Sequence, residues 1–316
     1  MNLLDAMRYL AALEQHRHFG RAAQACHITQ PALSNAVRAL ESEFGVTIVR
    51  RGRQYDGLTP EGRTVLASAH RMLHEREVLG QELQSAQADP QGNLVIGAVP
   101  TATPIASRFA ARLQARHPGI RSAVRSLSSV EIEAGIDSLG LDVAFGYSER
   151  AAGRDRRMLV LPQYTEHYFL LRRAASRRRG SARSRLGAPM RWRDAADNPL
   201  CMLTPEMHNR SIIDAAFAAA GVSVRPAVET NAVMMLVLSV LAGEVATVMP
   251  GALAAIALQY NELEALPLID PLVLTPIGIL MSNDERRSHT QRAALELAQD
   301  DEWLRLAASH SGDLLA

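Results

Sequence analysis

The sequence predicts an α/β protein in which an N-terminal winged helix-turn-helix and a linker helix precede two Rossmann-like lobes. Three observations predict this organisation. A helix with one apolar face and one short polar face spans Thr29–Glu41, directly after a short alanine-rich helix. A long stretch with few helix breakers follows over residues 59–88. From Asn93 onward, short apolar runs alternate with amphipathic segments, which is typical of a parallel sheet covered by helices.

Composition limits the classes of function. The chain has 316 residues, 47% of them hydrophobic, which is enough for two or three compact units. The sequence contains no lysine, so all 34 basic residues are arginine. This excludes the phosphate-binding lysine of P-loop proteins, the strand lysine of protein kinases and a pyridoxal Schiff base. The net charge is only +1, so the charge has to be interpreted locally.

Targeting and thiol chemistry are also limited by the sequence. No apolar run reaches the length of a membrane span, and residues 1–5 show no signal-peptide pattern. We therefore expect a cytoplasmic protein with no membrane partner. Two cysteines, Cys26 and Cys201, are too few for a disulfide framework and cannot enclose a zinc ion alone.

The helix that begins after Thr29 has two distinct faces. Thr29 is a good N-cap, and Leu33, Val37 and Leu40 form a stripe suited to burial. The opposite face carries short polar side chains and one arginine, which can meet base edges and phosphates in a major groove. An ordinary pair of packed helices explains the spacing alone equally well. The helix residues that we expect to contact DNA are Thr29, Gln30, Pro31, Ser34, Asn35 and Arg38.

A wing is predicted after this helix. Gly45 can end the helix in the left-handed conformation, and a β-rich run follows it. Arg50, Arg51 and Arg53 then lie in a loop beside glycines, where they could reach phosphates or a minor groove. The alternative is a solvated basic loop, but its position directly after a helix-turn-helix favours the wing.

The next helix has the pattern of a pairing helix. Its start is predicted by Thr59 as N-cap and Pro60 in the first turn. Its apolar positions alternate by four and three residues if Arg76 fills one gap, which indicates a heptad seam and a second copy of the helix as partner. We expect residues 89–92 to form a hinge after it. The apolar seam positions are Val65, Ala69, Met72, Leu79, Leu83 and Ala86.

The remaining chain predicts two units of alternating strands and helices. The first unit has strands at 94–98, 120–127 and 141–146, with helices at 106–116 and 130–139. The second has strands at 168–171, 199–203, 226–229 and 245–250, with helices at 209–220 and 232–241. A strand over 273–281 returns to the first unit, and a final helix spans 290–299.

A basic segment interrupts the second unit. Nine arginines lie between Arg172 and Arg193, among serine, alanine and glycine. This segment could be a second anion-binding patch. Its lack of periodicity and its few apolar residues favour a solvated insertion loop.

Taken together, these parts resemble LysR-type transcriptional regulators over nearly the full length. The residues that carry the resemblance are Ala22-Ala23, Thr29-Gln30-Pro31-Ala32-Leu33-Ser34, Leu40-Glu41 and Leu58-Thr59-Pro60-Glu61-Gly62. The resemblance implies a non-enzymatic regulator that binds double-stranded promoter DNA and is switched by a small-molecule effector. It also implies a dimer through the linker helix, a homotetramer, and contact with RNA polymerase. The implied parts are a winged helix-turn-helix (1–58), a linker helix (59–89), and a periplasmic-binding-protein-like effector domain with lobe I (92–163 and 268–305) and lobe II (164–267).

In a two-lobed α/β domain a ligand binds between the lobes, beyond the carboxyl ends of strands. Thr101 and Thr103 follow the first strand and precede a helix whose free N–H groups favour an anion. Since these loops carry hydroxyls and no strong charge, we expect a small carboxylate such as formate, or an inorganic anion. Helix capping explains each hydroxyl alone equally well. The effector-binding residues that the resemblance implies are Thr101, Thr103, Ser128, Thr204 and Thr247.

Two other classes use such a scaffold: metabolite-binding enzymes and solute-binding proteins. Cys26 lies in the helix-turn-helix and Cys201 in an apolar strand, and His167 and His208 show no triad or metal-ligand spacing. No glycine-rich dinucleotide fingerprint follows the first strand. A solute-binding protein would need an export signal. We therefore expect neither catalytic nor metal-binding residues, and no cofactor.

Overall fold

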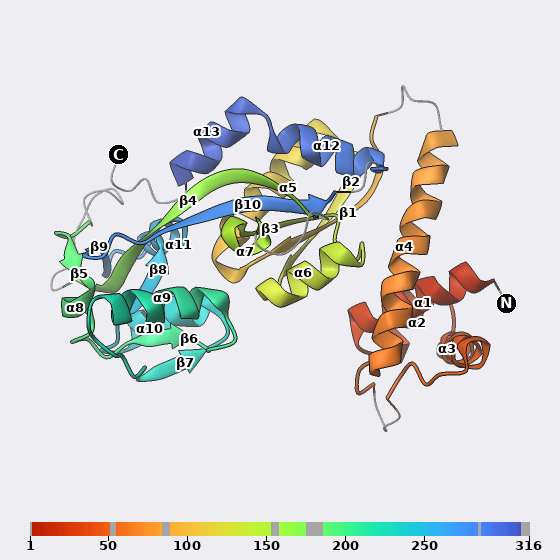
Figure 1. Cartoon of the computed structure of the whole chain (residues 1–316), viewed down its shortest axis with the longest axis horizontal. Helices are drawn as coiled ribbons and strands as arrows, with labels where there is room; N and C mark the ends of the chain where they lie inside the picture. The colour runs from red at the N-terminus through yellow and green to blue at the C-terminus, as the bar shows by residue number, and fades with distance from the viewer. Residues whose placement is uncertain are drawn as a thin grey trace. The chain divides into compact units, whose positions relative to one another are not determined.

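The computed structural model of the chain describes residues 2–50, 55–83, 89–152, 158–174, 186–283 and 286–310. They form two compact units, which we call the N-terminal unit (mainly residues 1–89) and the C-terminal unit (mainly residues 90–316) (Figure 1). Within these described ranges, no helix has both the length and the apolar character needed to cross a lipid bilayer.

Capping explains the boundaries of the helices in the N-terminal unit. The Oγ1 atom of Thr29 accepts a hydrogen bond from the backbone N–H of Ala32 at 3.4 Å. Gly45 ends the same helix with a φ of 66°, a left-handed conformation that glycine adopts without steric cost. Both predicted boundaries are therefore confirmed. The helices are α1 (Leu3–His16), α2 (Phe19–Ala25), α3 (Gln30–Phe44) and α4 (Pro60–Leu83).

One apolar core joins these helices. The predicted stripe of α3, Leu33, Val37 and Leu40, is at most 3% exposed and packs in a single cluster with residues of α1 and α2. Ala22 and Ala23 of α2 belong to the same cluster, and their small side chains allow α2 and α3 to pack closely. The arrangement is that of a helix-turn-helix.

The start of α4 is fixed by a cap and by a close backbone approach. The Thr59 hydroxyl accepts a hydrogen bond from the N–H of Gly62 at 2.9 Å and donates to the carbonyl of Thr47 at 2.6 Å, which confirms the predicted cap. A Cβ atom on Gly62 would lie 2.1 Å from the carbonyl oxygen of Ile48, so this position requires glycine. In contrast, a Cβ atom on Gly80 would meet no heavy atom within 4 Å.

Eight strands form the main sheet of the C-terminal unit, in the order β2-β1-β3-β10-β4-β9-β5, with β8 paired to β4. The parallel pairing of β1 with β2 and β3 confirms the predicted βαβαβ unit, and β10 returns to it antiparallel to β3. Another two strands, β6 (Cys201–Leu203) and β7 (Val228–Thr230), form a parallel pair. The strands of the main sheet are β1 (Gly92–Ala98), β2 (Ile120–Ser126), β3 (Val143–Tyr147), β4 (Met158–Arg173), β5 (Met190–Arg191), β8 (Thr247–Pro250), β9 (Leu263–Ile269) and β10 (Leu274–Ser282).

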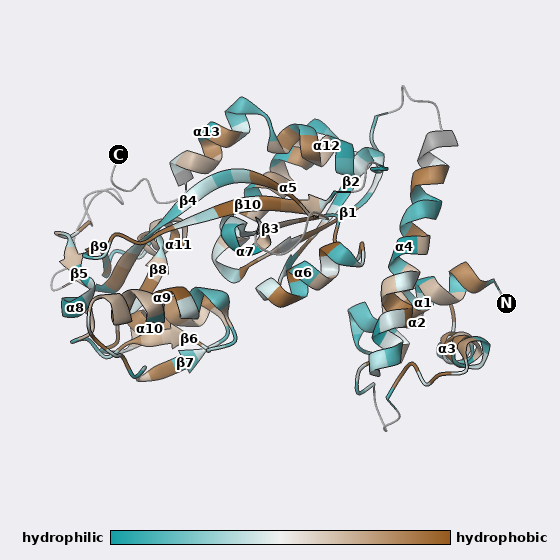
Figure 2. Ribbon diagram, viewed as in Figure 1, coloured by the Kyte–Doolittle hydropathy of each residue, from teal (hydrophilic) through white to brown (hydrophobic). Residues whose placement is uncertain are grey.

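Helices cover both faces of this sheet. Figure 1 shows α5, α12 and α13 on one face of the β1–β3 region and α6 and α7 on the other. Figure 2 shows hydrophobic and hydrophilic residues alternating along α12 and α13, as expected for amphipathic helices. The elements are η1 (Pro100–Ala102), α5 (Thr103–Arg116), α6 (Ser129–Asp137), α7 (Ser148–Ala152), α8 (Trp192–Ala195), α9 (His208–Ala219), α10 (Val233–Ala242), α11 (Gly251–Ala257), α12 (His289–Ala298) and α13 (Asp301–His310).

Two expectations are corrected here. The strand predicted over 168–171 is β4, which spans 16 residues, because polar residues such as Gln163 and His167 interrupt its apolar pattern. Its neighbours β8, β9 and β10 are all antiparallel to it, so the second unit is not purely parallel. The helix over 290–299 is not the last one. Trp303 of α13 is fully buried and donates a hydrogen bond from Nε1 to Gln163 Oε1 at 2.6 Å.

Strands β4 and β10 connect separate hydrophobic cores within the C-terminal unit. Tyr164 and Ile277 belong to the core around β1–β3, whereas Tyr168 packs in a core with residues of β6, α9 and β9. The chain therefore passes from one core to the other between Tyr164 and Tyr168. We call this segment, together with the facing residues of β10, the junction.

We predict that Gly62→Ala lowers the free energy of unfolding of the N-terminal unit by about 1–3 kcal/mol, because the new methyl group collides with the Ile48 carbonyl. Gly80→Ala is the matched control on the same helix. It should leave stability unchanged or raise it by up to about 1 kcal/mol, since alanine is the better helix former. Calorimetric melting of the full chain measures both. Equal effects of the two substitutions would contradict the close approach at Gly62.

Candidate DNA-binding surface and candidate effector site

The polar residues predicted to contact DNA share one exposed face of α3. Five of them are exposed and Ser34 is half-buried, while the apolar stripe lies on the opposite, buried face. The guanidinium of Arg38 donates to Asn35 Oδ1 at 3.4 Å, one turn earlier. The exposed residues are Thr29, Gln30, Pro31, Asn35 and Arg38.

The wing is attached to α3 by a carboxylate. Glu41 Oε1 accepts hydrogen bonds from the backbone N–H groups of Ile48 at 2.8 Å and Val49 at 3.2 Å. Val49 forms an antiparallel bridge with Leu58, and the described residues of the wing show no longer strand pairing. Glu41 therefore fixes the base of the wing against the polar-faced helix, a role that the sequence did not indicate.

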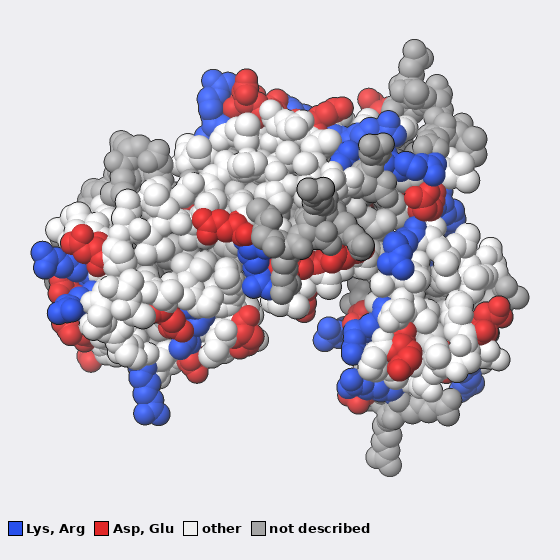
Figure 3. Space-filling view, viewed as in Figure 1, with Lys and Arg blue, Asp and Glu red and all other residues white. Residues whose placement is uncertain are grey.

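The described part of the wing places one arginine at the surface. The backbone N–H of Arg50 donates to the carbonyl of Gly57 at 3.0 Å, and the Arg50 side chain is exposed. Tyr55 donates a hydrogen bond to Glu14 of α1, which attaches the other side of the wing. Arg51 and Arg53 lie outside the described residues. Figure 3 shows arginines and acids interspersed over both units, in keeping with the low net charge.

Three of the five predicted effector contacts use their hydroxyls in local hydrogen bonds. Thr103 donates to the carbonyl of Pro100 at 2.8 Å, and Thr204 donates to Glu206 at 2.7 Å. Ser128 forms a capping box with Glu131, whose Oε2 lies 2.8 Å from both the N and the Oγ of Ser128. Helix capping, which was the alternative explanation for each of these hydroxyls, therefore accounts for Ser128.

The other two predicted contacts differ in position. Thr101 is 1% exposed, and its Oγ1 lies 3.2 Å from the hydroxyl of Tyr147. Thr247 is fully buried without a hydrogen-bond partner for Oγ1 among the described residues. It pairs with Leu171, three residues before Pro250, which pairs with Tyr168 at the junction. Of the two, only Thr101 contacts the polar residues of the junction.

The junction contains a buried polar cluster. Tyr164, Glu166 and Tyr168 alternate along β4 and therefore project from one face of it. Tyr164 donates to Glu166 Oε1 at 3.5 Å, and Thr275 of β10 pairs directly opposite Glu166. We define the junction cluster as Thr101, Tyr147, Tyr164, Glu166, Tyr168, His208, Asn209 and Thr275.

Residues from both lobes complete the cluster. The amide of Asn209, at the start of α9, donates to the hydroxyl of Tyr168, which lies 3.2 Å from Thr275 Oγ1. The rings of Tyr147 and His208 meet edge-to-face with centroids 4.7 Å apart. This cluster was not predicted from the sequence. The alternation of Tyr164, Glu166 and Tyr168 was the signal that could have revealed its β4 portion.

Burial controls the charge state of the cluster. Glu166 is fully buried, and burial raises its pKa to about 8, although hydrogen bonds from Tyr164 and Thr101 partly oppose this shift. Burial also lowers the pKa of His208, and nearby Arg150 lowers it further. At neutral pH the carboxyl is therefore protonated and the imidazole uncharged. Glu166 Oε2 has no hydrogen-bond partner in the described part of the chain.

The arginines nearest the junction are held by acids. Arg150 of α7 pairs with Glu133 of α6, which is itself only 9% exposed. Arg210 of α9 donates to Glu229 at 2.7 Å and to Asp214 at 2.9 Å. Both guanidinium groups are thus paired with carboxylates, although Arg150 lies close enough to His208 to lower the pKa of that imidazole.

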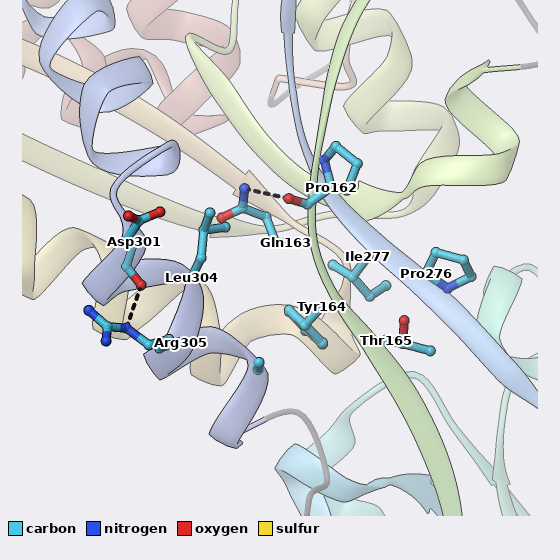
Figure 4. Close-up of a pocket in the computed structure, with 10 residues that line it drawn as sticks. Pro162, Gln163, Tyr164, Thr165, Pro276, Ile277, Asp301, Leu304 and Arg305 are labelled. Atoms are coloured by element: carbon cyan, nitrogen blue, oxygen red, sulfur yellow. Dashed lines mark hydrogen bonds between the residues drawn. The ribbon is translucent and has the colours of Figure 1, made fainter.

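An open pocket of about 760 Å³ lies between β4, β10 and α13 (Figure 4). Gln163 and Thr165, which alternate with the cluster residues along β4, contribute to its wall, as does Tyr164 of the cluster, whereas none of the predicted effector contacts does. Among the described residues, no group of three or more histidines, cysteines or acids is placed to hold a metal ion. The residues that line the pocket are Pro162, Gln163, Tyr164, Thr165, Pro276, Ile277, Asp301, Leu304, Arg305 and Ala308.

The chain resembles curated regulators over part of their length. It is 36% identical over 146 residues to a hydrogen peroxide-inducible genes activator of Pectobacterium carotovorum, covering 46% of this chain and 48% of that protein. It is 37% identical over 122 residues to the SDS degradation transcriptional activation protein of a Pseudomonas species, covering 38% and 40%. The chain thus spans about half the length of the curated relatives it matches.

Solved structures share the fold over nearly the whole chain. A variant of full-length OxyR from Pseudomonas aeruginosa has a TM-score of 0.67 at 21% identity, covering 98% of this chain and 99% of that one. Full-length CbnR complexed with its target DNA has a TM-score of 0.63 at 18% identity, covering 98% and 100%.

Two family models match this chain. The bacterial regulatory helix-turn-helix protein model of the lysR family matches residues 4–63, which include α1, α2, α3 and the wing. The LysR substrate binding domain model matches residues 87–302, which is more than half of the chain and includes the junction cluster. The chain therefore belongs to the LysR family.

Proposed function

We propose that the protein is a DNA-binding transcriptional regulator whose activity is switched by a small molecule bound at the junction between the two lobes. The observation that carries the proposal is the exposed polar face of α3, held beside a wing by the two backbone contacts of Glu41. The two family models and the fold shared with DNA-bound CbnR support it. In this proposal the chain has no catalytic function.

In the proposed complex, α3 enters the major groove. Gln30, Ser34 and Arg38 face the bases, since amide, hydroxyl and guanidinium groups match the hydrogen-bonding pattern of base edges. The wing arginines Arg50, Arg51 and Arg53 contact the phosphate backbone, which sets position rather than sequence preference.

We further propose that α4 pairs with the same helix of a second copy. Met72 and Leu79 are 45% and 52% exposed and lie seven residues apart, with exposed Arg76 between them. An apolar seam at heptad spacing is stabilised by a partner helix. A tetramer needs a second surface, and α10 offers one: Met234, Met235 and Leu238 are between 43% and 59% exposed.

The junction cluster is the proposed effector site. It combines residues of η1, β3, β4, β10 and α9, so a ligand there would contact both lobes and shift their equilibrium by its differential affinity. Thr101 is the predicted effector contact that lies within the cluster. The pocket between β4, β10 and α13 is not required for this proposal.

Oxidation of a thiol is a second candidate signal, because several relatives are described as hydrogen peroxide-inducible genes activators. Thiol sensors need an accessible cysteine of low pKa. Cys201 is fully buried in β6, and burial raises the pKa of both its thiol and that of Cys26. These environments disfavour thiolate chemistry, so we propose ligand binding rather than oxidation as the signal.

We expect Arg38→Ala to weaken binding to the protein's own upstream DNA by about 1–3 kcal/mol, which is roughly 5- to 150-fold in Kd. Ser34→Ala should weaken it in the same direction. Arg71→Ala, an exposed arginine of α4, is the control and should leave binding unchanged. Gel-shift titration at fixed salt measures all three. Wild-type affinity in both α3 variants would refute the proposed DNA-binding face.

The double substitution Met72→Arg and Leu79→Arg should reduce the molecular mass of the assembly, because it places two charges in the proposed seam. Arg71→Ala lies on the same helix but outside the seam and should keep the wild-type mass. Sedimentation equilibrium of the full chain provides the measurement. A double variant with the wild-type mass would contradict pairing through α4.

Hydrogen peroxide should leave DNA affinity within about twofold of its starting value, both in the wild type and in a Cys26→Ser, Cys201→Ala variant, because neither thiol has the low pKa that a sensor needs. Gel shifts before and after peroxide treatment test this. A peroxide effect that is present in the wild type and absent in the variant would favour oxidation as the signal.

A further inference from the structure

Glu166 lies in the interior of the junction, and one of its carboxyl oxygens has no partner among the described residues. The residue is 0% exposed, Tyr164 donates to Oε1, and Oε2 has no partner among the described residues. A buried polar atom without a partner is unfavourable, because it has lost its hydrogen bond to water and gained none in the protein. An apolar side chain in its place would avoid this cost, so the position of the carboxyl requires an explanation.

Among the described residues, no arginine pairs with or hydrogen-bonds to Glu166. Of the groups that face it, Tyr164 and Tyr168 come from β4 and Tyr147 comes from β3, whereas His167 alternates with Glu166 along the strand. From η1 comes Thr101, from β10 Thr275, and from α9 Asn209, which are all uncharged. His208 contacts the ring of Tyr147, and its lowered pKa leaves it neutral at pH 7.

Arg150 and Arg210 add no unpaired positive charge to the cluster. Arg150 is held by Glu133, and Arg210 is held by Glu229 and Asp214. An anionic ligand at the cluster would therefore meet a carboxyl and several hydroxyls but no free positive charge. A cationic ligand would meet one acidic group with a vacant acceptor oxygen, together with tyrosine rings, whose faces attract cations.

From these contacts we infer that the effector is an organic cation, a protonated amine that donates a hydrogen bond to Glu166. This inference rests on the proposed function, since it names the ligand class of the proposed effector site. It also reverses the expectation of a small carboxylate, which was based on the hydroxyls of the loops and on the free N–H groups at the start of a helix. Hydroxyls accept as readily as they donate, so they do not decide the sign of the ligand.

Binding of an amine must release a proton. Burial holds the pKa of Glu166 near 8, so at pH 7 the free site carries a neutral carboxyl. The ammonium group keeps its three protons, and the carboxyl proton passes to solvent as the ion pair forms. Affinity therefore rises about tenfold per pH unit up to pH 8 and then levels off. An anionic ligand shows the opposite slope, because it needs Glu166 to stay protonated.

The test is calorimetric titration of the full chain with n-butylammonium chloride, and with sodium butyrate as the anion of similar size, at pH 6.5, 7.5 and 8.5. We expect the amine to bind, with affinity at pH 7.5 about tenfold above that at pH 6.5. Repeating the titration in buffers of different ionisation enthalpy should show the release of close to one proton per amine bound. Sodium chloride at the same ionic strength is the blank.

Glu166→Gln is the decisive variant, because glutamine keeps the size of the side chain but has an NH₂ donor in place of one oxygen and cannot ionise. It should lose amine affinity by at least tenfold at pH 8.5, together with the pH slope. Glu206→Gln is the matched control: Glu206 is exposed in the loop after β6 and lies outside the junction cluster. It should bind the amine like the wild type.

The stability of Glu166→Gln provides a readout that needs no ligand. Because the folded-state pKa is raised above the unfolded value, the wild type loses stability as the pH rises from about 4.5 to 8, and the glutamine variant does not. Its melting temperature should therefore exceed that of the wild type increasingly over this range. A constant difference across this range would show that Glu166 is ionised throughout.

Three results would overturn the inference: no amine binding at any pH, binding of butyrate in place of the amine, or amine binding that survives Glu166→Gln. The titration requires no DNA, so it is independent of the proposed regulatory function. If the chain binds its upstream DNA but no amine, only this inference fails. If it binds the amine but no DNA, only the proposed function fails.

Discussion

The antiparallel pairing of β4 with β10 is the constraint on which the C-terminal unit depends. Strand β4 contributes to both hydrophobic cores and so links the two lobes, and β10 pairs with it from Met158 to His167. Between the two cores, polar residues of η1, β3 and α9 contact the polar side chains of β4 and β10. The junction cluster follows from this geometry, and so does the burial of Glu166, because every side of that residue is covered by another element.

In the N-terminal unit, too, a carboxylate joins two parts of the structure, but there both hydrogen bonds come from backbone N–H groups. Glu41 accepts hydrogen bonds from two backbone N–H groups and so fixes the wing to α3, whereas Glu166 has one acceptor oxygen without a partner. The first carboxylate accepts both of these bonds with Oε1. The second has an oxygen without a partner among the described residues, and for this reason we propose it as a ligand contact.

Features encoded within a few residues could be predicted from the sequence. The N-caps at Thr29 and Thr59 and the left-handed end at Gly45 each depend on contacts within four residues. The βαβαβ unit was predictable because the apolar runs at β1 and β3 alternate with amphipathic segments. The junction cluster was not, since its residues come from five elements distant in sequence. The full length of β4 was hidden for a related reason: polar residues interrupt its apolar pattern, and some of them, such as Gln163, bond to other elements.

The proposed location of the effector and its proposed charge rest on different observations. The expected location beyond the carboxyl ends of strands follows from topology, and Thr101 fits it. The expected charge was inferred from hydroxyl-bearing residues and from the free N–H groups of a helix, and the hydroxyls are largely occupied: Ser128 caps α6, and Thr103 and Thr204 bond to neighbours. The chain has no lysine, and Arg150 and Arg210 are each paired with an acid. The proposed sign of the ligand therefore depends on the carboxyl of Glu166, whose Oε2 has no partner among the described residues.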